Sequence, residues 1–187
     1  MSKLFVDEIV HQSSQGSGTI TIGASGETIS IPSGATLDLS NATQTGVGGV
    51  NTPAFQAYKS SSQSISDATD TKVTFDIETF DTDNAFASST FTVPSGKNGK
   101  YFIYAQLQLD TGSGSTFFVS VYKNGSEVFS KRMTSNGSNR QSPAVSTVIS
   151  LVATDTVEIY TFQNSGVSRD CDAANQRTHF GGYKIIE

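Results

Sequence analysis

The sequence contains one cysteine and no tryptophan, and it has no long apolar run. A lone thiol, Cys171, excludes an intrachain disulfide and a cysteine-based metal cage. No segment approaches the roughly 20 apolar residues that span a bilayer, so we expect no membrane insertion. The net charge is −5, with 12 Lys and Arg against 17 Asp and Glu. This balance offers no basic surplus for neutralising phosphates and argues against nucleic acid as a partner.

The amino-terminal segment, residues 1–15, does not have the pattern of a secretory signal. Asp7 and Glu8 interrupt its short apolar stretch, and no long apolar core follows. We therefore expect synthesis in a host cytoplasm without a signal peptide. The segment is too short to fold alone, which leaves two interpretations. It is a terminal arm packed on its own domain, or it is a docking arm that inserts into a larger assembly through Leu4, Phe5, Val6, Ile9 and Val10.

A short repeat occupies residues 16–40. Units of the form Thr-apolar-polar-apolar begin at Thr19, Thr28 and Thr36, and turn-like residues such as Ser33-Gly34-Ala35 separate them. Two apolar side chains per unit are too few for an independent core. Such strands become stable when several chains wrap around one another, so we predict a short intertwined β-shaft. The alternative is a three-stranded meander on the main domain. Residues 41–52 are glycine-rich and predict a linker.

Residues 53–187 predict an all-β domain. Apolar residues make up 35% and charged residues 16% of the chain, and Ser, Thr, Gly, Asn and Gln are abundant, which is typical of short strands joined by turns. Asn124-Gly125 between two alternating runs is a strong hairpin signal. About ten antiparallel strands favour a β-sandwich, most simply a jelly roll. The expected strands are 54–58, 63–66, 72–75 with 78–80, 90–93, 100–109, 116–123, 127–133, 144–151, 156–162 and 179–186.

The longest predicted strand, 100–109, has two different faces. Tyr101, Ile103 and the next alternate residues form an apolar row, while Phe102 and Tyr104 point to the other side. A lone domain has no reason to place two aromatic rings in water, so we expect this second face to meet another copy of the chain. By the same parity we predict six trimer-interface residues, at least half of them buried between chains: Phe102, Tyr104, Phe118, Tyr122, Tyr160 and Phe162.

Several spaced residues in this region form a pattern. Its landmarks are Phe75, Asp81, Phe86, Phe91, Gly99, Tyr101 and Ile103, then Lys123-Asn124-Gly125, Leu151 to Val157 and Phe180-Gly181-Gly182-Tyr183. This pattern resembles the signature of the C1q/TNF globular head. Two departures stand out, because Ile103 replaces an aromatic residue and Thr154 stands where glycine is usual. The resemblance covers about 53–187 and implies a trimeric jelly roll at the end of a stalk.

The first fifty residues resemble the amino-terminal part of tail-fibre and appendage proteins of tailed bacteriophages. The similarity lies in the arm at 1–15, the Thr-Ile repeats and the glycine-rich joint. Together the two resemblances imply a homotrimeric structural or attachment protein of a phage virion, whose arm contacts other virion proteins. The alternative is a non-viral C1q/TNF-like binding module or bacterial adhesin, and a glycan-degrading tailspike ranks last.

Residues with catalytic or metal-binding chemistry are few. The two histidines are His11 and His179, and no G-x-S-x-G elbow occurs. The pairs Asp81/Asp83 and Asp170/Asp172 could act on a glycan or hold calcium, but the segment 81–84 is better interpreted as a self-capping turn. We therefore expect no enzymatic activity and no cofactor, with calcium at a loop or at the trimer axis left open.

Two long polar segments, 134–142 and 164–177, are the predicted recognition loops. Loops held on a rigid sandwich commonly carry binding residues, and arginine suits carboxylate or phosphate groups of a surface polysaccharide. Ordinary solvated loops are the competing interpretation. The expected contacts with a host-surface glycan or protein are Asn136, Asn139, Arg140, Arg169, Asp170, Asp172 and Arg177.

Overall fold

The computed structural model describes residues 28–38 and 51–185, apart from 138–139 and 174–175. The chain divides into two units, Met1–Val47 and Gly48–Glu187. In the first, the described residues 28–38 contain no helix or strand. The predicted turn is present, since the amide of Ala35 donates to the carbonyl of Pro32 at 3.1 Å. The β-shaft needs neighbouring chains as pairing partners, so a single chain does not test it and it stays a prediction.

The described part of the second unit is built from strands, and none of its described residues lies in an α-helix. The strands are β1 (Ala54–Tyr58), β2 (Gln63–Ile65), β3 (Thr71–Lys72), β4 (Ile77–Asp81), β5 (Phe86–Ala87), β6 (Thr90–Thr92), β7 (Gly99–Gln106), β8 (Gln108–Asp110), β9 (Thr116–Lys123), β10 (Ser126–Thr134), β11 (Arg140–Gln141), β12 (Ala144–Leu151), β13 (Thr156–Gln163), β14 (Arg169–Asp172) and β15 (His179–Lys184).

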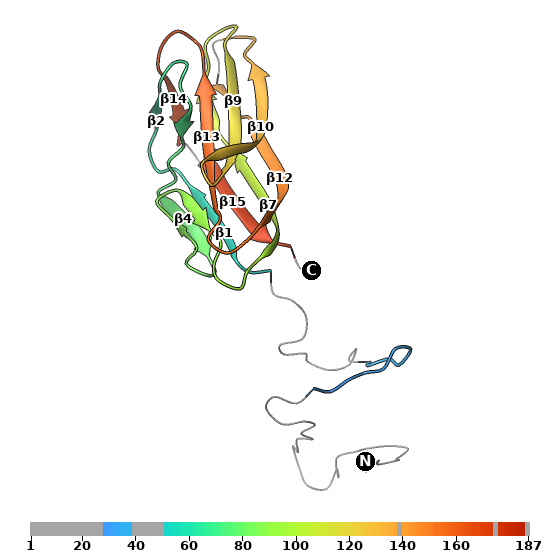
Figure 1. Cartoon of the computed structure of the whole chain (residues 1–187). Helices are drawn as coiled ribbons and strands as arrows, with labels where there is room; N and C mark the ends of the chain where they lie inside the picture. The colour runs from blue at the N-terminus through green and yellow to red at the C-terminus, as the bar shows by residue number, and fades with distance from the viewer. Residues whose placement is uncertain (1–27, 39–50, 138–139, 174–175, 186–187) are drawn as a thin grey trace, which may run out of the picture. The chain divides into compact units, whose positions relative to one another are not determined.

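The strands form a sandwich with jelly-roll character, which confirms the predicted fold class (Figure 1). One layer is the sheet β12-β7-β15-β1-β4, and the other is β10-β9-β13-β6-β5 with β3 beside β13. A shorter sheet, β11-β8-β14-β2, continues the first layer through β8 and β14. Every recorded strand pair is antiparallel.

The core lies between the two layers and contains the predicted inner row of β7 and β8. Tyr101 and Ile103 are fully buried. Phe55 of β1 stacks on Phe91 at a centroid distance of 4.6 Å and meets Phe180 edge-on at 5.0 Å. Such aromatic pairs add stability beyond the area they bury. Except for Tyr183, which is 36% exposed, the aromatic landmarks of the sequence pattern are therefore core residues that hold the two layers together.

The hairpin predicted at Asn124-Gly125 is confirmed. The two residues have φ values of +50° and +77°, as a two-residue turn between β9 and β10 requires. The turn is tied to the neighbouring β12–β13 connection. The side chain of Asn124 donates to Asp155 at 2.7 Å and accepts from the amide of Thr156 at 2.8 Å. This link fixes one end of the second layer.

Thr154, in the β12–β13 connection, has a φ of +74°. A β-branched residue is strained in this left-handed region, which explains why glycine is usual here in the pattern that the sequence resembles. We expect Thr154→Gly to raise the free energy of unfolding by about 0.5–1 kcal/mol, as relief of strain exceeds the gain in unfolded-chain entropy. Urea denaturation measures this. As a control, Thr156→Gly in β13 is expected to destabilise, and a destabilised Thr154→Gly would contradict the strain argument.

Candidate interaction surfaces

The outward side of the sheet β12-β7-β15-β1-β4 carries an ordered array of side chains that we call the β7 face. The strand registers place its members in three rows. These are Ala144, Gln106, His179, Tyr58 and Ile77; then Ser146, Tyr104, Gly181, Gln56 and Phe80; then Val148, Phe102, Tyr183 and Ala54. None of these fourteen residues is Asp, Glu, Lys or Arg. The next outward pair along β12 and β7, Ser150 and Lys100, places an ammonium group at the border of the face.

Aromatic rings dominate the middle of the β7 face. The ring of Phe102 lies 6.1 Å from that of Tyr104 and 5.5 Å from that of Tyr183. Around them, Phe80 is 45% exposed and Val148 52% exposed. A contiguous apolar and aromatic surface of this kind is typical of a protein–protein interface rather than of a sheet face that is exposed to solvent.

Gly181 allows Tyr104 to lie flat across β15. A Cβ atom at this position would come within 2.4 Å of the Tyr104 hydroxyl and 2.9 Å of the Phe55 carbonyl oxygen. The absence of a side chain therefore sets the height of the tyrosine ring above the sheet. Burial, with a smaller effect from Tyr183, raises the pKa of Tyr104, so its hydroxyl stays neutral at physiological pH.

The other four predicted interface aromatics lie on the opposite outer face of the sandwich, on β9 and β13. Tyr122 stacks on Tyr160 with a centroid distance of 4.1 Å. Phe118 meets Phe162 edge-on at 5.6 Å, and the guanidinium of Arg132 lies 5.6 Å from the centre of the Phe118 ring. The six residues thus divide between two faces and do not form the single surface that their shared parity suggested. Which face meets a neighbouring chain stays a prediction.

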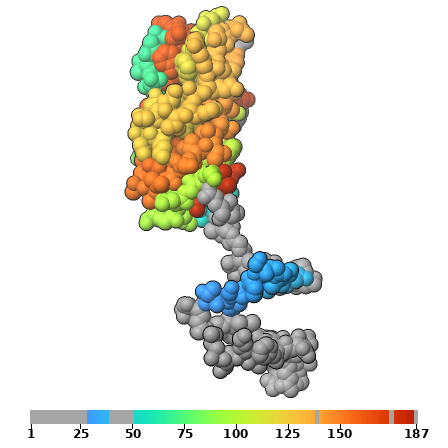
Figure 2. Space-filling view, turned by 45° about the vertical axis from the view of Figure 1, so that its right-hand side comes forward, coloured from blue at the N-terminus to red at the C-terminus, as the bar shows by residue number. Residues whose placement is uncertain are grey.

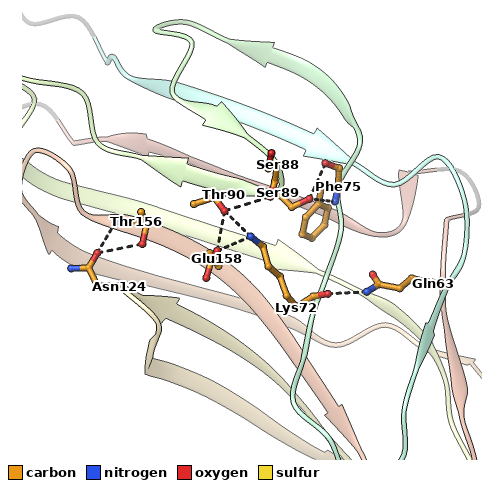
Figure 3. Close-up of polar contacts among 9 residues, drawn as sticks. All are labelled: Gln63, Lys72, Phe75, Ser88, Ser89, Thr90, Asn124, Thr156 and Glu158. Carbon is orange, nitrogen blue, oxygen red and sulfur yellow. Dashed lines mark hydrogen bonds and ion pairs between the residues drawn. The ribbon is translucent and has the colours of Figure 1, made fainter.

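A polar network borders this second aromatic group (Figure 3). The ammonium of Lys72 lies 2.6 Å from a carboxylate oxygen of Glu158 and 2.7 Å from the hydroxyl of Thr90, which itself donates to Glu158 at 2.9 Å. Burial disfavours the ionised form of Glu158, but the bonds from Lys72 and Thr90 outweigh it and lower the pKa of this carboxyl. The network is internally satisfied and joins β3, β6 and β13.

The edge of the sandwich formed by β10 and β12 exposes two further apolar side chains, beside the exposed charged residues Glu127, Lys131 and Arg132 of β10. Val128 is 46% exposed and Phe129 40% exposed. The strand register shifts between Glu127 and Phe129, as at a bulge, which typically bends an edge strand. Figure 2 is turned toward this side, where yellow and orange segments of the two strands reach the surface. We call this surface the β10 edge.

The predicted recognition segment 164–177 is not one continuous loop, because β14 occupies Arg169–Asp172 within it. The strand pairs with β2 and β8, contacts that are distant in sequence and leave no local periodic signal. Of the predicted binding residues, Arg169 and Asp172 therefore belong to a strand, as does Asp170. Arg169 donates to the hydroxyl of Ser165 at 2.9 Å and approaches Asp110 at 4.0 Å.

Three predicted binding residues meet at this end of the head. Arg140 forms an ion pair with Asp172 at 2.7 Å, and Arg177 donates to the side chain of Gln108, a neighbour of Asp172 through the β8–β14 pairing. Asn136 is exposed elsewhere on the preceding loop. Asn139 and the predicted docking residues Leu4, Phe5, Val6, Ile9 and Val10 lie outside the described residues.

The acidic residues considered for catalysis or calcium binding at 81–84 form a turn. Asp81 accepts hydrogen bonds from the amides of Phe86 at 2.7 Å and Asp83 at 3.3 Å, and Asp83 lies 3.5 Å from the ammonium of Lys97. This confirms the self-capping interpretation. Within 28–38 and 51–185, no cluster of three or more His, Cys, Asp or Glu side chains is placed to hold a metal, and no pocket is present.

Comparison with known proteins agrees with this fold. The family model of the C1q domain matches residues 54–185, whereas no curated protein matches the chain. The globular domain of zebrafish complement 1qA superposes with a TM-score of 0.53 at 17% identity, covering 72% of this chain and 98% of that one. Murine APRIL gives 0.55 at 14%, covering 71% and 98%. Eiger TNF from S. frugiperda gives 0.51 at 12%, covering 72% and 92%.

The three solved structures share at most 17% sequence identity with this chain, so they indicate the fold alone. The family match spans the sandwich from β1 to the end of β15. It also agrees with the positive φ at Thr154 and with the burial of five aromatic landmarks, Phe75, Phe86, Phe91, Tyr101 and Phe180. The chain belongs to the C1q domain family.

Proposed function

We propose that this protein is a homotrimeric structural or attachment protein of a tailed bacteriophage virion, with a C1q head that binds a host-surface glycan or protein or another virion protein. C1q heads are binding modules. We further propose that three copies assemble and that the assembly belongs to a phage virion. The trimer is supported by features of the head itself. The virion setting is supported by the resemblance of residues 1–50 to tail-fibre and appendage proteins.

The observation that carries the trimer is the uncharged β7 face. Fourteen positions across five strands include Phe102, Tyr104 and Tyr183 and no acidic or strongly basic side chain. Sheets that face water normally alternate apolar and polar residues, and here the outward row is as aromatic as an interface core. Covering it with a second copy removes this surface from water.

A closed ring of three chains requires two different surfaces that fit each other, because each copy uses one surface toward each neighbour. The β10 edge supplies a second contact surface through Val128 and Phe129, with the exposed Glu127 beside them. Contact between the β10 edge of one copy and the β7 face of the next satisfies this requirement. The aromatic group on β9 and β13 then lies outside the ring, with Lys72 and Glu158 at its border.

The amino-terminal segment supports the proposed place in a virion. Ile29, Ile31 and Leu37 are exposed to 58%, 47% and 61% in the single chain, and they alternate with polar residues as the predicted shaft requires. Three chains together provide enough apolar side chains for a shared interior. The arm at 1–15 then contacts other virion proteins, and the head projects from them.

Locating the protein on purified virions tests the setting. We expect electron cryomicroscopy of particles, with proteomic confirmation of the chain, to show threefold density with the sandwich at its tip and residues 1–15 within the particle. Particles assembled with a chain lacking residues 1–15 are the matched control and are expected to lose this density. Absence of the chain from virions, with ligand binding retained by the trimer, favours the non-viral binding module or adhesin.

Binding to the host is tested on the full chain. We expect the purified trimer to bind host cells, and Arg140→Ala combined with Arg177→Ala to reduce that binding at least tenfold without changing the oligomeric mass. The double variant Lys97→Ala and Lys184→Ala, which also removes two positive charges and lies outside β10 and the fourteen residues of the β7 face, serves as the matched control. Equal loss in both variants would indicate attraction by charge alone rather than recognition by this end of the head.

A further inference from the structure

Asn-Gly dipeptides occur three times in the sequence, at Asn98-Gly99, Asn124-Gly125 and Asn136-Gly137. This pair of residues favours spontaneous deamidation, because glycine has no Cβ that would keep its backbone nitrogen away from the asparagine side chain. The reaction needs no oxidant and no enzyme. In a folded protein its rate depends on whether the asparagine side chain and the backbone beside it are free to move, so the structure ranks the three sites.

Hydrogen bonds hold two of the three asparagines. The side chain of Asn124 donates to Asp155 at 2.7 Å and accepts from the amide of Thr156 at 2.8 Å, and the paired strands β9 and β10 close its turn. The side-chain oxygen of Asn98 accepts from the amide of Ala153 at 2.7 Å, and the residue after it begins β7. Attack on either side chain requires these hydrogen bonds to break.

Asn136 lies in the loop that follows β10 and is exposed. Its side chain forms no hydrogen bond with any residue in the described part of the chain. The amide nitrogen of Gly137 is 3.4 Å from the hydroxyl oxygen of Ser135, which is long for a hydrogen bond. A Cβ atom at Gly137 would meet nothing within 4 Å beyond its chain neighbours. Both reacting groups are therefore free to approach each other.

We propose that Asn136 is a site of spontaneous deamidation, which adds a negative charge to the loop before Arg140. The backbone nitrogen of Gly137 attacks the side-chain carbonyl carbon of Asn136 and closes a succinimide ring, while the bond from that carbon to the side-chain nitrogen breaks. Ammonia leaves with the proton of the Gly137 amide. Water then opens the ring at either carbonyl and leaves an aspartyl or an isoaspartyl residue at position 136.

The new carboxylate lies in the predicted recognition segment 134–142, which continues into Arg140 of β11. Arg140 already forms an ion pair with Asp172 at 2.7 Å, so a further negative charge on this loop opposes the binding of carboxylate or phosphate groups. We expect Asn136→Asp to bind host cells about two- to fivefold more weakly than wild type. This consequence rests on the proposed host-binding function, whereas the reaction at Asn136 does not.

Peptide mapping of the full chain by mass spectrometry, after timed incubation in mildly alkaline buffer, measures deamidation at the three sites. Each hydrogen bond that must break slows the reaction by about fivefold. We therefore expect Asn136 to react about fivefold faster than Asn98 and more than about tenfold faster than Asn124. Asn136→Gln is expected to remove the rapid mass increase from the peptide 133–140. Incubation in guanidinium chloride is the matched control, in which the three sites are expected to react at similar rates.

The outcomes separate the reaction from its consequence. Equal rates at the three sites of the folded chain overturn the inference. A preference for Asn136 that persists unchanged in guanidinium chloride also overturns it, because the preference then comes from neighbouring residues and not from the fold. Rapid deamidation with undiminished binding by Asn136→Asp overturns only the effect on recognition. A wild-type chain that does not bind host cells contradicts the proposed host-binding function and leaves the measured rates as they are.

Discussion

Replacing Tyr104 with lysine is expected to convert the trimer into folded monomers. The substitution places an ammonium group in the middle row of the β7 face, beside Phe102 and Tyr183 and with no carboxylate among the face's members. Burying such a charge in each copy outweighs the apolar contacts, and we expect the association constant to fall at least a hundredfold. Light scattering coupled to size-exclusion chromatography measures the change from three times 19.8 kDa to the mass of one chain.

The fold itself is expected to survive this substitution, because Tyr104 points outward and the core row of Tyr101 and Ile103 is untouched. Tyr122→Lys is the matched control on the opposite face. There the new ammonium would lie opposite Glu158 and Glu127, and we expect the trimer to persist. If Tyr122→Lys separates the chains and Tyr104→Lys does not, the interface lies on the β9–β13 side and our assignment of the β7 face is wrong.

Replacing Asp155 with alanine is expected to destabilise the head by about 2–3 kcal/mol. One carboxylate oxygen accepts from Asn124 at 2.7 Å, and the other accepts from the amide of Val152 and from Lys123, both at 2.9 Å. Asp155 itself is buried, and loss of its carboxylate removes the acceptor of three donors at once, which is among the larger effects of single substitutions. Chemical denaturation measures the change, with Asp70→Ala at an exposed position as a control expected to change stability by less than about 0.5 kcal/mol.

The same carboxylate makes stability depend on pH in acid. The hydrogen bond from Lys123, followed by those from Val152 and Asn124, lowers the pKa of Asp155 from 3.8 to about 2. Because the folded-state pKa lies below the unfolded value, the contribution is present above about pH 4 and is lost as the pH falls toward 2. Screening by solvent reduces it to about 1–2 kcal/mol. We expect Asp155→Ala to lose less stability than wild type between pH 4 and pH 2, and parallel curves would contradict this role.

Strands with strong alternation were predictable from the sequence. The expected strands 54–58 and 116–123 coincide with β1 and β9, because each has one buried face and a clear turn signal beside it. The expected strand 100–109 is interrupted at Leu107, whose amide donates to the carbonyl of Pro143. That hydrogen bond joins residues that are distant in sequence, so no local sequence pattern predicts it.

Turns without glycine were harder to predict. Ser88 and Ser89 have φ values of +50° and +60° and connect β5 to β6. Their conformation depends on a distant segment, since the buried hydroxyl of Ser89 accepts from the amide of Phe75 at 2.8 Å and donates to its carbonyl at 3.2 Å. The contact with Phe75 therefore stabilises a positive-φ turn in which asparagine or glycine is usual.

The candidate surfaces were predictable only in part. Period-two alternation identified Phe102 and Phe118 as outward-facing, but it does not tell which sheet of a sandwich a strand joins. That information lies in the strand order, where β7 and β9 belong to opposite layers. For the same reason the exposed Val128 and Phe129 received no role from the sequence, since an edge strand is recognised only once its neighbours are known.

The native mass of the unmodified chain at pH 7.5 tests the central claim most directly. The uncharged β7 face and the β10 edge both require a partner if they are surfaces of association, and a closed ring of three provides one for each. Native mass spectrometry is expected to give a species of three times 19.8 kDa that persists at micromolar concentration. A single species of 19.8 kDa under the same conditions would contradict the account.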